Sequence, residues 1–136
     1  MIYAVIDTNV LVSALLSRHS DAATIQVVKA VLEKRILPLY NDEIIAEYEE
    51  VLSRKKFSFP YNDIRSILDM IMEVGRSAER TPVTENFPDP KDVVFYEIAM
   101  SKEDAYLVTG NTKHFPKSPV VVTPAEMVEI LNREIV

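Results

Sequence analysis

The stretch IYAVIDTNV (residues 2–10) gives the first indication of how this chain folds. Its first five residues are apolar and mostly β-branched or aromatic, a pattern that predicts a short buried strand. Asp7, Thr8 and Asn9 then interrupt the apolar run, which resumes as NVLVSALLS and predicts one or two helical turns. A carboxylate therefore stands at the carboxyl end of the first predicted strand, within a stretch that otherwise resembles hydrophobic core.

The rest of the chain repeats this alternation of short apolar strands and amphipathic helices. Further strands are predicted at ILPLY (36–40), ERTPV (79–83), AYLVTGN (105–111) and VVVT (120–123). The strand at 79–83 is expected at an edge, because its proline cannot donate to a central ladder. Helices are predicted over 21–36, 42–56, 64–74, 90–101 and 124–135. The alternation predicts an α/β fold in which helices flank a mainly parallel sheet.

Polar residues near the start of the predicted helices indicate where several of them begin. Ser20 or Asp21 is the expected N-cap of the helix over 21–36, and Asn41 is that of the next helix. Thr123 and Glu126 have the spacing of a capping box at the start of the last helix. We therefore expect side-chain caps at these three helix starts.

Composition excludes several classes of protein. At 136 residues the chain is expected to form one domain over 1–136. It has no cysteine and only two histidines, which excludes thiolate chemistry, disulfides and most zinc sites. Its only glycines are Gly75 and Gly110, so neither a P-loop nor a dinucleotide-binding loop is present. Any bound metal must therefore be held by oxygen ligands.

Charge and hydropathy bear on where the protein works. The formal net charge of −6 argues against a protein that coats nucleic acid, but not against a small acidic metal site. No apolar run approaches the roughly 18 residues that a membrane span needs. The amino-terminal stretch lacks the basic segment of a signal peptide, and Asp7 and Asn9 interrupt its apolar run. We expect a cytoplasmic protein with no membrane association.

Two polar residues follow predicted strands directly. Asp7 follows the first strand, and Asn111 ends the strand AYLVTGN. In parallel α/β sheets, ligand sites gather outside the carboxyl ends of the strands, so both side chains should open onto one edge. Each also has an ordinary explanation, because Asp7 can end a strand and cap a helix, and Asn111 after Gly110 can be a turn residue.

Two acids on the helix over 42–56 are candidates for the same edge. At about 100° per residue, the apolar residues of this helix occupy one arc, and Glu47 and Glu49 lie on its opposite flanks. Helical periodicity therefore does not choose between them. Both are also explained as solvated acids that border a buried stripe.

The segment DPKD at the start of the helix over 90–101 supplies a further candidate. Asp89 is the expected N-cap, Pro90 takes the first helical position and Asp92 the third. Carboxylates in a first helical turn are stabilised by about 0.3–1 kcal/mol, so capping alone explains either acid. A cap needs only one of them, however, and Ser or Thr would serve equally well.

Convergence of these side chains would favour a divalent cation between them. Clustered carboxylates repel one another, which raises their pKa values or destabilises the fold unless a cation is bound. Mg²⁺ or Mn²⁺ suits such a site, because Mg²⁺ takes few carboxylates, keeps several waters and coordinates phosphate oxygens.

Four stretches of the chain together resemble a PIN domain, in the branch similar to VapC-type toxins and toxin components of toxin–antitoxin systems. In order, they are VIDTNVLVSALL, YNDEIIAEYEEVLSRKKF, DPKDVVFYEIAMSKEDAYLVTGN and TKHFP. Their order and contexts make the match specific, and they span nearly the whole chain. The resemblance implies a three-layer α/β/α sandwich around a mainly parallel sheet, with a metal-dependent ribonuclease site.

The resemblance also assigns the site residue by residue. Asp7 matches the first acid of the family, Glu47 in AEYEEVL the second, and Asp92 the third. This favours Glu47 over Glu49, a choice that periodicity leaves open. Asn111 stands where VTGD supplies a fourth acid in many relatives. An amide oxygen can bind a hard cation but carries no charge, so metal affinity should be lower, particularly at a second site.

The leading hypothesis is a metal-dependent endoribonuclease that hydrolyses RNA phosphodiester bonds. The three acids would hold Mg²⁺ or Mn²⁺ directly or through waters, and water would be the nucleophile. Thr8, Asn9 and Thr109 would orient those carboxylates, and Lys and Arg around the pocket would contact the RNA backbone. The resemblance further implies a toxin that is inhibited by a small antitoxin protein and that forms a homodimer.

Two other hypotheses stay open. A PIN-like module that binds RNA or a protein without cleaving it would explain Asn111 as a sign of lost catalysis. A phosphoryl-transfer enzyme or receiver-type domain with Asp7 as nucleophile is opposed by Asn9, because the haloacid-dehalogenase pattern requires a second aspartate at that position.

Overall fold

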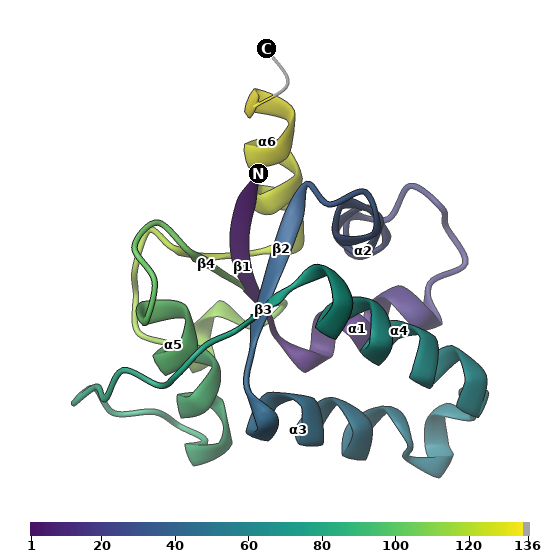
Figure 1. Ribbon diagram of the computed structural model, residues 1–136, viewed down its shortest axis with the longest axis horizontal. Helices are drawn as coiled ribbons and strands as arrows, with labels where there is room; N and C mark the ends of the chain where they lie inside the picture. Colours follow the sequence, from purple (N-terminus) through teal and green to yellow (C-terminus); the bar gives the residue numbers. More distant parts are fainter. Residues whose placement is uncertain (135–136) are drawn as a thin grey trace.

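A five-stranded sheet forms the centre of the computed structural model, which describes residues 1–134 (Figure 1). All neighbouring strands are parallel, in the order β3-β2-β1-β4-β5. The predicted α/β fold is confirmed. The strands are β1 (Ile2–Ile6), β2 (Ile36–Tyr40), β3 (Arg76–Ser77), β4 (Tyr106–Val108) and β5 (Val121–Val122).

The helices flank this sheet. They are α1 (Thr8–Leu16), α2 (Ala23–Leu32), α3 (Asp42–Leu52), α4 (Tyr61–Val74), α5 (Val93–Met100) and α6 (Pro124–Glu134). In Figure 1, α1, α2 and α4 lie on one side of the central strands and α5 lies on the other, while α6 packs against α2. α3 lies across the end of β2 and contacts α1, α4 and α5. Within residues 1–134, no helix combines the length and the apolar character needed to cross a bilayer.

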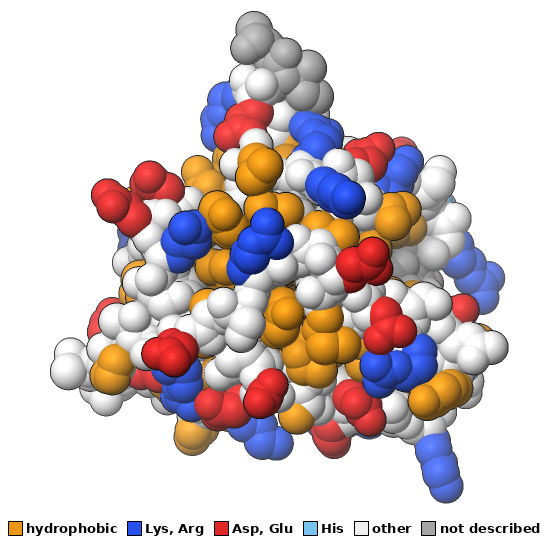
Figure 2. Space-filling view, in the orientation of Figure 1, with side chains coloured by type: hydrophobic (Ala, Val, Ile, Leu, Met, Phe, Trp, Pro, Cys, Tyr) orange, Lys and Arg blue, Asp and Glu red, His pale blue; other side chains and the backbone are white. Residues whose placement is uncertain are grey.

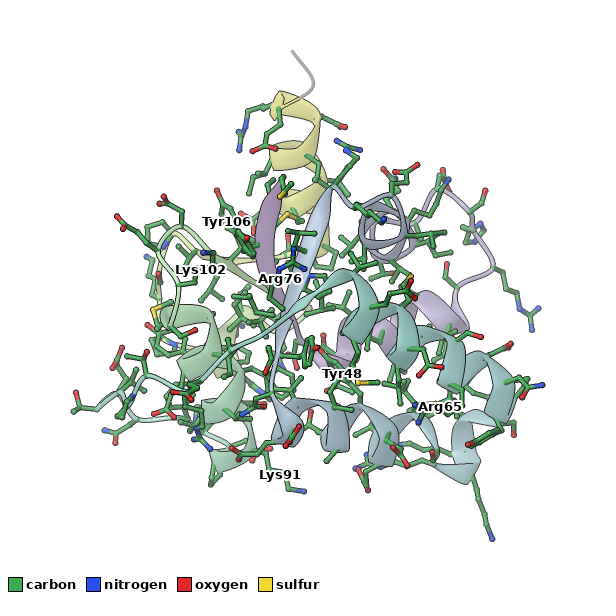
Figure 3. The ribbon with its side chains drawn as sticks, in the orientation of Figure 1. Tyr48, Arg65, Arg76, Lys91, Lys102 and Tyr106 are labelled. Atoms are coloured by element: carbon green, nitrogen blue, oxygen red, sulfur yellow. The ribbon has the colours of Figure 1, made fainter. Side chains whose placement is uncertain are left out.

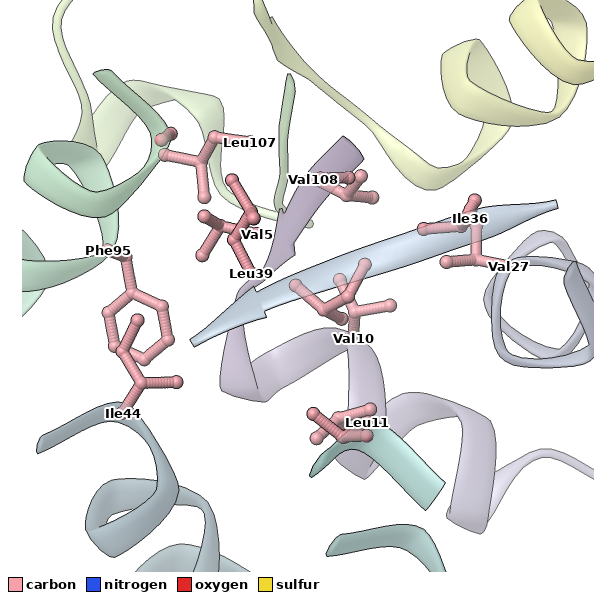
Figure 4. Close-up of a cluster of buried hydrophobic side chains, with 14 of the residues drawn as sticks. Val5, Val10, Leu11, Val27, Ile36, Leu39, Ile44, Phe95, Leu107 and Val108 are labelled. Atoms are coloured by element: carbon pink, nitrogen blue, oxygen red, sulfur yellow. The ribbon is translucent and has the colours of Figure 1, made fainter. Parts of the chain in front are cut away.

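The hydrophobic core surrounds the three central strands (Figure 4). Val5, Ile36 and Leu107, one from each of these strands, are fully buried. Phe95 of α5 and Val10 of α1 are buried around them. Burying such a side chain contributes roughly 1.5–3 kcal/mol relative to leaving it exposed. Apolar strands covered by helices are the pattern that a parallel sheet requires.

The ends of β1 and β4 meet where the strand order reverses. β2 and β3 lie on one side of β1, and β4 and β5 lie on the other. In open α/β sheets, ligands bind in the crevice at such a switch point, outside the carboxyl ends of the strands. Asp7 directly follows β1, and its N–H donates to the carbonyl of Val108, the last residue of β4, at 2.9 Å. Asp7 therefore lies at the switch point.

The caps predicted for α3 and α6 are confirmed. Asn41 accepts a hydrogen bond at its Oδ1 from the Ile44 N–H at 2.9 Å, at the start of α3. Thr123 and Glu126 form a capping box, in which each backbone N–H donates to the other side chain, at 2.9 and 3.1 Å. These bonds satisfy N–H groups that the first turn of a helix leaves free.

The cap predicted at Ser20 or Asp21 is wrong. α2 begins at Ala23, its N-cap is Ala22, and no side chain caps it. Both polar residues lie in the preceding turn. Instead, the carbonyl of Asp21 accepts a hydrogen bond from the side chain of Gln26 at 2.6 Å.

The edge strand predicted at 79–83 is also wrong, because β3 is the two-residue segment Arg76–Ser77. The Thr81 N–H donates to the carbonyl of Glu97 at 3.2 Å, and the Val83 N–H donates to the Glu97 carboxylate at 2.9 Å. Residues 79–83 therefore bind to α5 and do not extend the sheet.

Other helix boundaries also differ from the predicted ones: the helix predicted over 21–36 ends at Leu32, and the helix predicted over 64–74 begins at Tyr61. The helix predicted over 42–56 ends at Leu52 and is followed by a 3₁₀ turn over Lys55–Phe57. The helix predicted over 90–101 begins as a 3₁₀ turn over Pro90–Asp92, before α5 starts. The last residue of the helix predicted over 124–135 lies outside the described residues.

Candidate active site

Asp7 is a buried carboxylate, with only 7% of its surface exposed. Its Oδ2 accepts hydrogen bonds from the Thr109 hydroxyl at 2.7 Å and from the Asn9 amide at 3.2 Å. Burial raises the pKa of the Asp7 carboxyl to about 6 against the lowering effect of the Thr109 bond, and the charge of Asp92 adds to the rise. A nearby cation would favour the ionised form.

The turn after β4 is bound to the first turn of α1. Thr109 is fully buried, and its hydroxyl also accepts a hydrogen bond from the Asn111 N–H at 3.0 Å. The Gly110 N–H donates to the Asn9 Oδ1 at 3.1 Å. Thr109 and Asn9 thus bind both this turn and the Asp7 carboxylate, which holds the carboxylate in one orientation.

Glu47 approaches Asp7 from α3. Its Oε2 accepts a hydrogen bond from the hydroxyl of Thr8, the residue after Asp7. Burial raises the pKa of Glu47 against the effect of the Thr8 bond, and the charge of Asp7 raises it further. Glu49, the alternative, is exposed and lies 3.8 Å from the guanidinium of Arg65. The fold therefore turns Glu47, and not Glu49, toward the end of β1.

The buried Tyr48 anchors this part of α3. Its hydroxyl donates to the backbone carbonyl of Ile6, and Figure 3 shows the side chain pointing from α3 toward the strands. Its ring lies 6.2 Å from that of Phe95 of α5, measured between centroids. These contacts connect α3 to β1 and to α5, the elements next to Asp7 and Asp92, and so determine where Glu47 lies.

Asp92 lies at the end of the 3₁₀ turn before α5. Its Oδ2 lies 3.3 Å from the Nδ1 of His114, within ion-pair distance. This oxygen is buried and has no hydrogen-bond partner among residues 1–134. Burial raises the pKa of Asp92, and the charges of Asp89 and Glu47 contribute, while His114 opposes them. A buried carboxylate oxygen without a donor is a position that a cation would satisfy.

Asp89 has the capping role expected of it. Its Oδ1 accepts a hydrogen bond from the Lys91 N–H at 2.9 Å, and the residue is exposed. Asp89 therefore caps the turn, and Asp92 is the acid of the DPKD segment that faces the interior of the site.

Asn111 is the predicted site residue with the weakest connection to the others. In the described part of the chain, its side chain forms no hydrogen bond with Asp7, Glu47 or Asp92. It lines a cavity of about 340 Å³ together with Asn9 and other residues on the α1 side of the turn. Its backbone N–H donates to the Thr109 hydroxyl, which in turn donates to Asp7.

The three carboxylates influence one another but do not form a ready-made ligand set. The negative charge of Asp92 raises the pKa of Asp7, and the charge of Asp7 raises the pKa of Glu47. The charge of Glu47 in turn raises the pKa of Asp92. Within residues 1–134, no three His, Asp or Glu side chains lie close enough together to hold a metal as they are positioned. The all-oxygen donors and the unpartnered Asp92 oxygen fit Mg²⁺ or Mn²⁺. Binding one ion jointly would require these side chains to turn inward.

Sequence patterns assigned no role to three basic residues around the acids. His114 lies against Asp92, and the charge of Lys91 lowers the pKa of Glu47. Arg80 and Lys91 line a cavity of about 200 Å³ with Glu47. The segment TKHFP, which contributes to the family resemblance, was the available signal for His114. Nothing in the local sequence indicates that Arg80 reaches the site.

Comparison with known proteins identifies the family of this chain. A family model described as PIN domain matches residues 3–113, most of the chain. The chain belongs to the PIN-domain family. PIN domains are generally nucleases, and the matched span of this PIN domain contains all four predicted site positions. A search of curated proteins found no match. The assignment of Asp7, Glu47, Asp92 and Asn111 as metal ligands stays a prediction.

Proposed function

We propose that this PIN domain is a Mg²⁺- or Mn²⁺-dependent endoribonuclease that hydrolyses RNA phosphodiester bonds. One observation carries the proposal: Asp7, Glu47 and Asp92 approach the sheet switch point from three different elements, and burial raises the pKa of each. Functional sites typically hold carboxylates together in partly buried positions, although this lowers the stability of the folded protein. Family membership supports nuclease chemistry.

The residues of the site would have two roles, binding the ion and orienting the residues that bind it. Asp7, Glu47 and Asp92 would hold the ion, which when bound lowers the pKa of a water and stabilises charge on the attacked phosphate. Thr109 and Thr8 would keep the Asp7 and Glu47 carboxylates oriented toward it through their hydrogen bonds.

We further propose that the protein is the toxin of a toxin–antitoxin pair, cytoplasmic and homodimeric, and inhibited by a small antitoxin. The resemblance to VapC-type toxins supports this part. Growth arrest on expression, relieved by co-expression of a small protein encoded next to the gene, would be the expected result. Normal growth during expression of a protein that cleaves RNA in vitro would contradict it.

A catalytically weak module that binds RNA or protein is the second candidate. Two observations favour it. Asn111 stands where the family resemblance implies a fourth acid, and residues 1–134 contain no ready-made metal cluster. An uncharged fourth position reduces the attraction for a second divalent ion.

Metal-dependent cleavage of a panel of structured RNAs separates the two candidates. The nuclease proposal predicts cleavage by the wild type with Mg²⁺ or Mn²⁺, none with EDTA, and loss of cleavage in Asp7→Asn. Asp69→Asn is the matched control, since Asp69 is an exposed acid on α4 that pairs with Arg65. RNA binding without cleavage, or equal cleavage by wild type and Asp7→Asn, would support the binding module instead.

A further inference from the structure

Arg80 joins two acidic residues at the rim of the candidate site. Its Nε donates to the Glu97 carboxylate at 2.6 Å, and one terminal nitrogen donates to both oxygens of Glu43, at 3.1 and 2.8 Å. The Glu97 side chain is 9% exposed, whereas that of Glu43 is 56% exposed. Arg80 therefore has one buried partner on α5 and one solvent-facing partner on α3.

Glu97 also binds the backbone of the residues that follow Arg80. Its second carboxylate oxygen accepts a hydrogen bond from the Val83 N–H at 2.9 Å, and its carbonyl accepts one from the Thr81 N–H at 3.2 Å. Both oxygens of this buried carboxylate are thus engaged with residues 80–83. Loss of one partner of a buried charge leaves the other unpaired at a high cost, so Glu97 holds Arg80 firmly.

Arg80 shares a small cavity with Glu47 and Lys91. These three residues line the cavity of about 200 Å³ together with Glu43, next to Pro90. Figure 3 shows Lys91 between the start of α5 and the start of α3, and Figure 2 shows acidic and basic side chains next to one another at this lower edge. Two cations therefore stand beside one of the proposed metal ligands.

We propose that Arg80 and Lys91 bind a backbone phosphate of RNA beside the metal site, and that Glu97 is the positioning residue that holds Arg80 there. This inference rests on the proposed function. The second terminal nitrogen of Arg80 makes no hydrogen bond within residues 1–134, so its donors can reach a phosphate. The exposed bond to Glu43 contributes little to stability, so a phosphate can replace Glu43.

The two acidic partners of Arg80 should then have opposite effects on RNA binding. Glu97→Gln releases the guanidinium from its fixed position and should weaken binding. Glu43→Gln removes a carboxylate that competes with phosphate and should strengthen binding. A purely structural role for this network predicts weaker binding in both variants, because each loses a hydrogen-bond partner.

Binding can be measured without cleavage by fluorescence anisotropy of a labelled single-stranded RNA of mixed sequence. The Asp7→Asn background with Mg²⁺ prevents hydrolysis. Arg80→Ala should raise the dissociation constant about tenfold and reduce the salt slope of binding by about one. Glu97→Gln, like Arg80→Ala, should raise the dissociation constant and reduce the salt slope. Arg80→Lys should bind RNA more tightly than Arg80→Ala.

A second exposed ion pair provides the control. Arg54 and Glu50 are exposed and bonded to each other at 3.0 Å, away from the cavity. Arg54→Ala and Glu50→Gln therefore match Arg80→Ala and Glu43→Gln in charge. The gain in RNA affinity from Glu43→Gln should disappear in an Arg80→Ala background. If the gain came only from a general loss of negative charge, it would remain in that background.

Cleavage assays in the otherwise wild-type chain separate failure of this inference from failure of the proposed function. Arg80→Ala should raise KM about tenfold with a smaller effect on kcat, because a phosphate contact away from the scissile bond binds ground and transition states alike. An Arg80→Ala variant that matches Arg54→Ala in dissociation constant and salt slope overturns the inference. Absence of metal-dependent cleavage in the wild type overturns the proposed function, while the binding experiments still test the phosphate contact.

Discussion

Asp7 destabilises the folded protein whenever it is ionised and no cation is bound. Its pKa rises from an ordinary value of 3.8 to about 6 on folding, chiefly through burial. When folding raises the pKa of a carboxyl, the free energy of unfolding is unaffected at a pH below the pKa in the unfolded chain. It falls as the pH rises from that value toward the pKa in the folded protein. The shift of about two units corresponds to roughly 3 kcal/mol lost above about pH 7.

Asp7→Asn should therefore stabilise the metal-free protein at neutral pH. Thr109 and Asn9 donate to the same oxygen of Asp7, so an amide oxygen can accept both bonds. In urea unfolding with EDTA, we expect a free energy of unfolding about 1–3 kcal/mol above wild type at about pH 7.5. At about pH 4 the difference should nearly vanish. A variant that is less stable than wild type at the higher pH would contradict this account of Asp7.

Glu47 and Glu49 allow a test of the site with two substitutions in one turn of α3. Glu47→Gln should reduce RNA cleavage by about a hundredfold or more, because it removes a charge that would hold the ion. Glu49→Gln should leave cleavage within about twofold, since Glu49 is exposed and faces Arg65, and exposed ion pairs contribute little. Initial rates at saturating Mg²⁺ measure both. Equal losses in the two variants would exclude the assigned role of Glu47.

At the scale of elements, Gly75 permits the end of α4 to meet β2. A Cβ at this position would lie 2.6 Å from the carbonyl oxygen of Ile71 and 2.9 Å from the Cγ of Pro38, and closer still to the Pro38 carbonyl oxygen. Gly75→Ala should therefore lower the free energy of unfolding by about 1–3 kcal/mol.

Gly110→Ala is the matched control for this prediction. A Cβ there would meet nothing nearer than the Asn9 Oδ1, at 3.5 Å, and the backbone φ is not positive. We expect a change of no more than about 0.5 kcal/mol in the same urea titration. Equal effects of the two substitutions would show that the contact between α4 and β2 is not as close as described.

Element prediction from the sequence succeeded where a local pattern carries the information. The apolar runs of β1, β2, β4 and β5 and the caps at Asn41 and Thr123 follow from neighbouring residues. The strand predicted at 79–83 failed because Glu97, far along the chain, binds that segment through side chain and backbone. β3 itself has two exposed polar residues and no periodicity that could identify it.

In the site too, local sequence patterns predict some features, and contacts between distant residues determine the others. The position of Asp7 at a strand end follows from the strand pattern together with the rule for parallel sheets. The choice of Glu47 over Glu49 did not follow from helical periodicity, because it depends on how Tyr48 and Thr8 place α3 against β1. The contacts of His114 with Asp92 and of Arg80 with Glu97 join distant residues through the fold, and only the folded chain reveals them.

At the scale of the whole molecule, a bound cation should restore part of the folding stability that the ionised carboxylates of the site remove. A ligand that binds only the folded state stabilises it by an amount that grows with its concentration relative to Kd. Mg²⁺ or Mn²⁺ should therefore raise the melting temperature of the wild type at about pH 7.5, and much less at about pH 4, where the carboxyls are protonated. Differential scanning fluorimetry measures this, with Asp7→Asn and Asp69→Asn compared. Equal shifts in both variants would indicate general charge screening.

The central claim is that Asp7, Glu47 and Asp92 jointly hold a divalent ion at the carboxyl edge of the sheet. A crystal soaked in Mn²⁺ and measured for anomalous scattering tests it most directly. We predict an anomalous peak between the three carboxylates, with the buried Asp92 Oδ2, which accepts no hydrogen bond within residues 1–134, among its ligands. Fully occupied Mn²⁺ elsewhere on the molecule, with no peak between these three side chains, would contradict the claim.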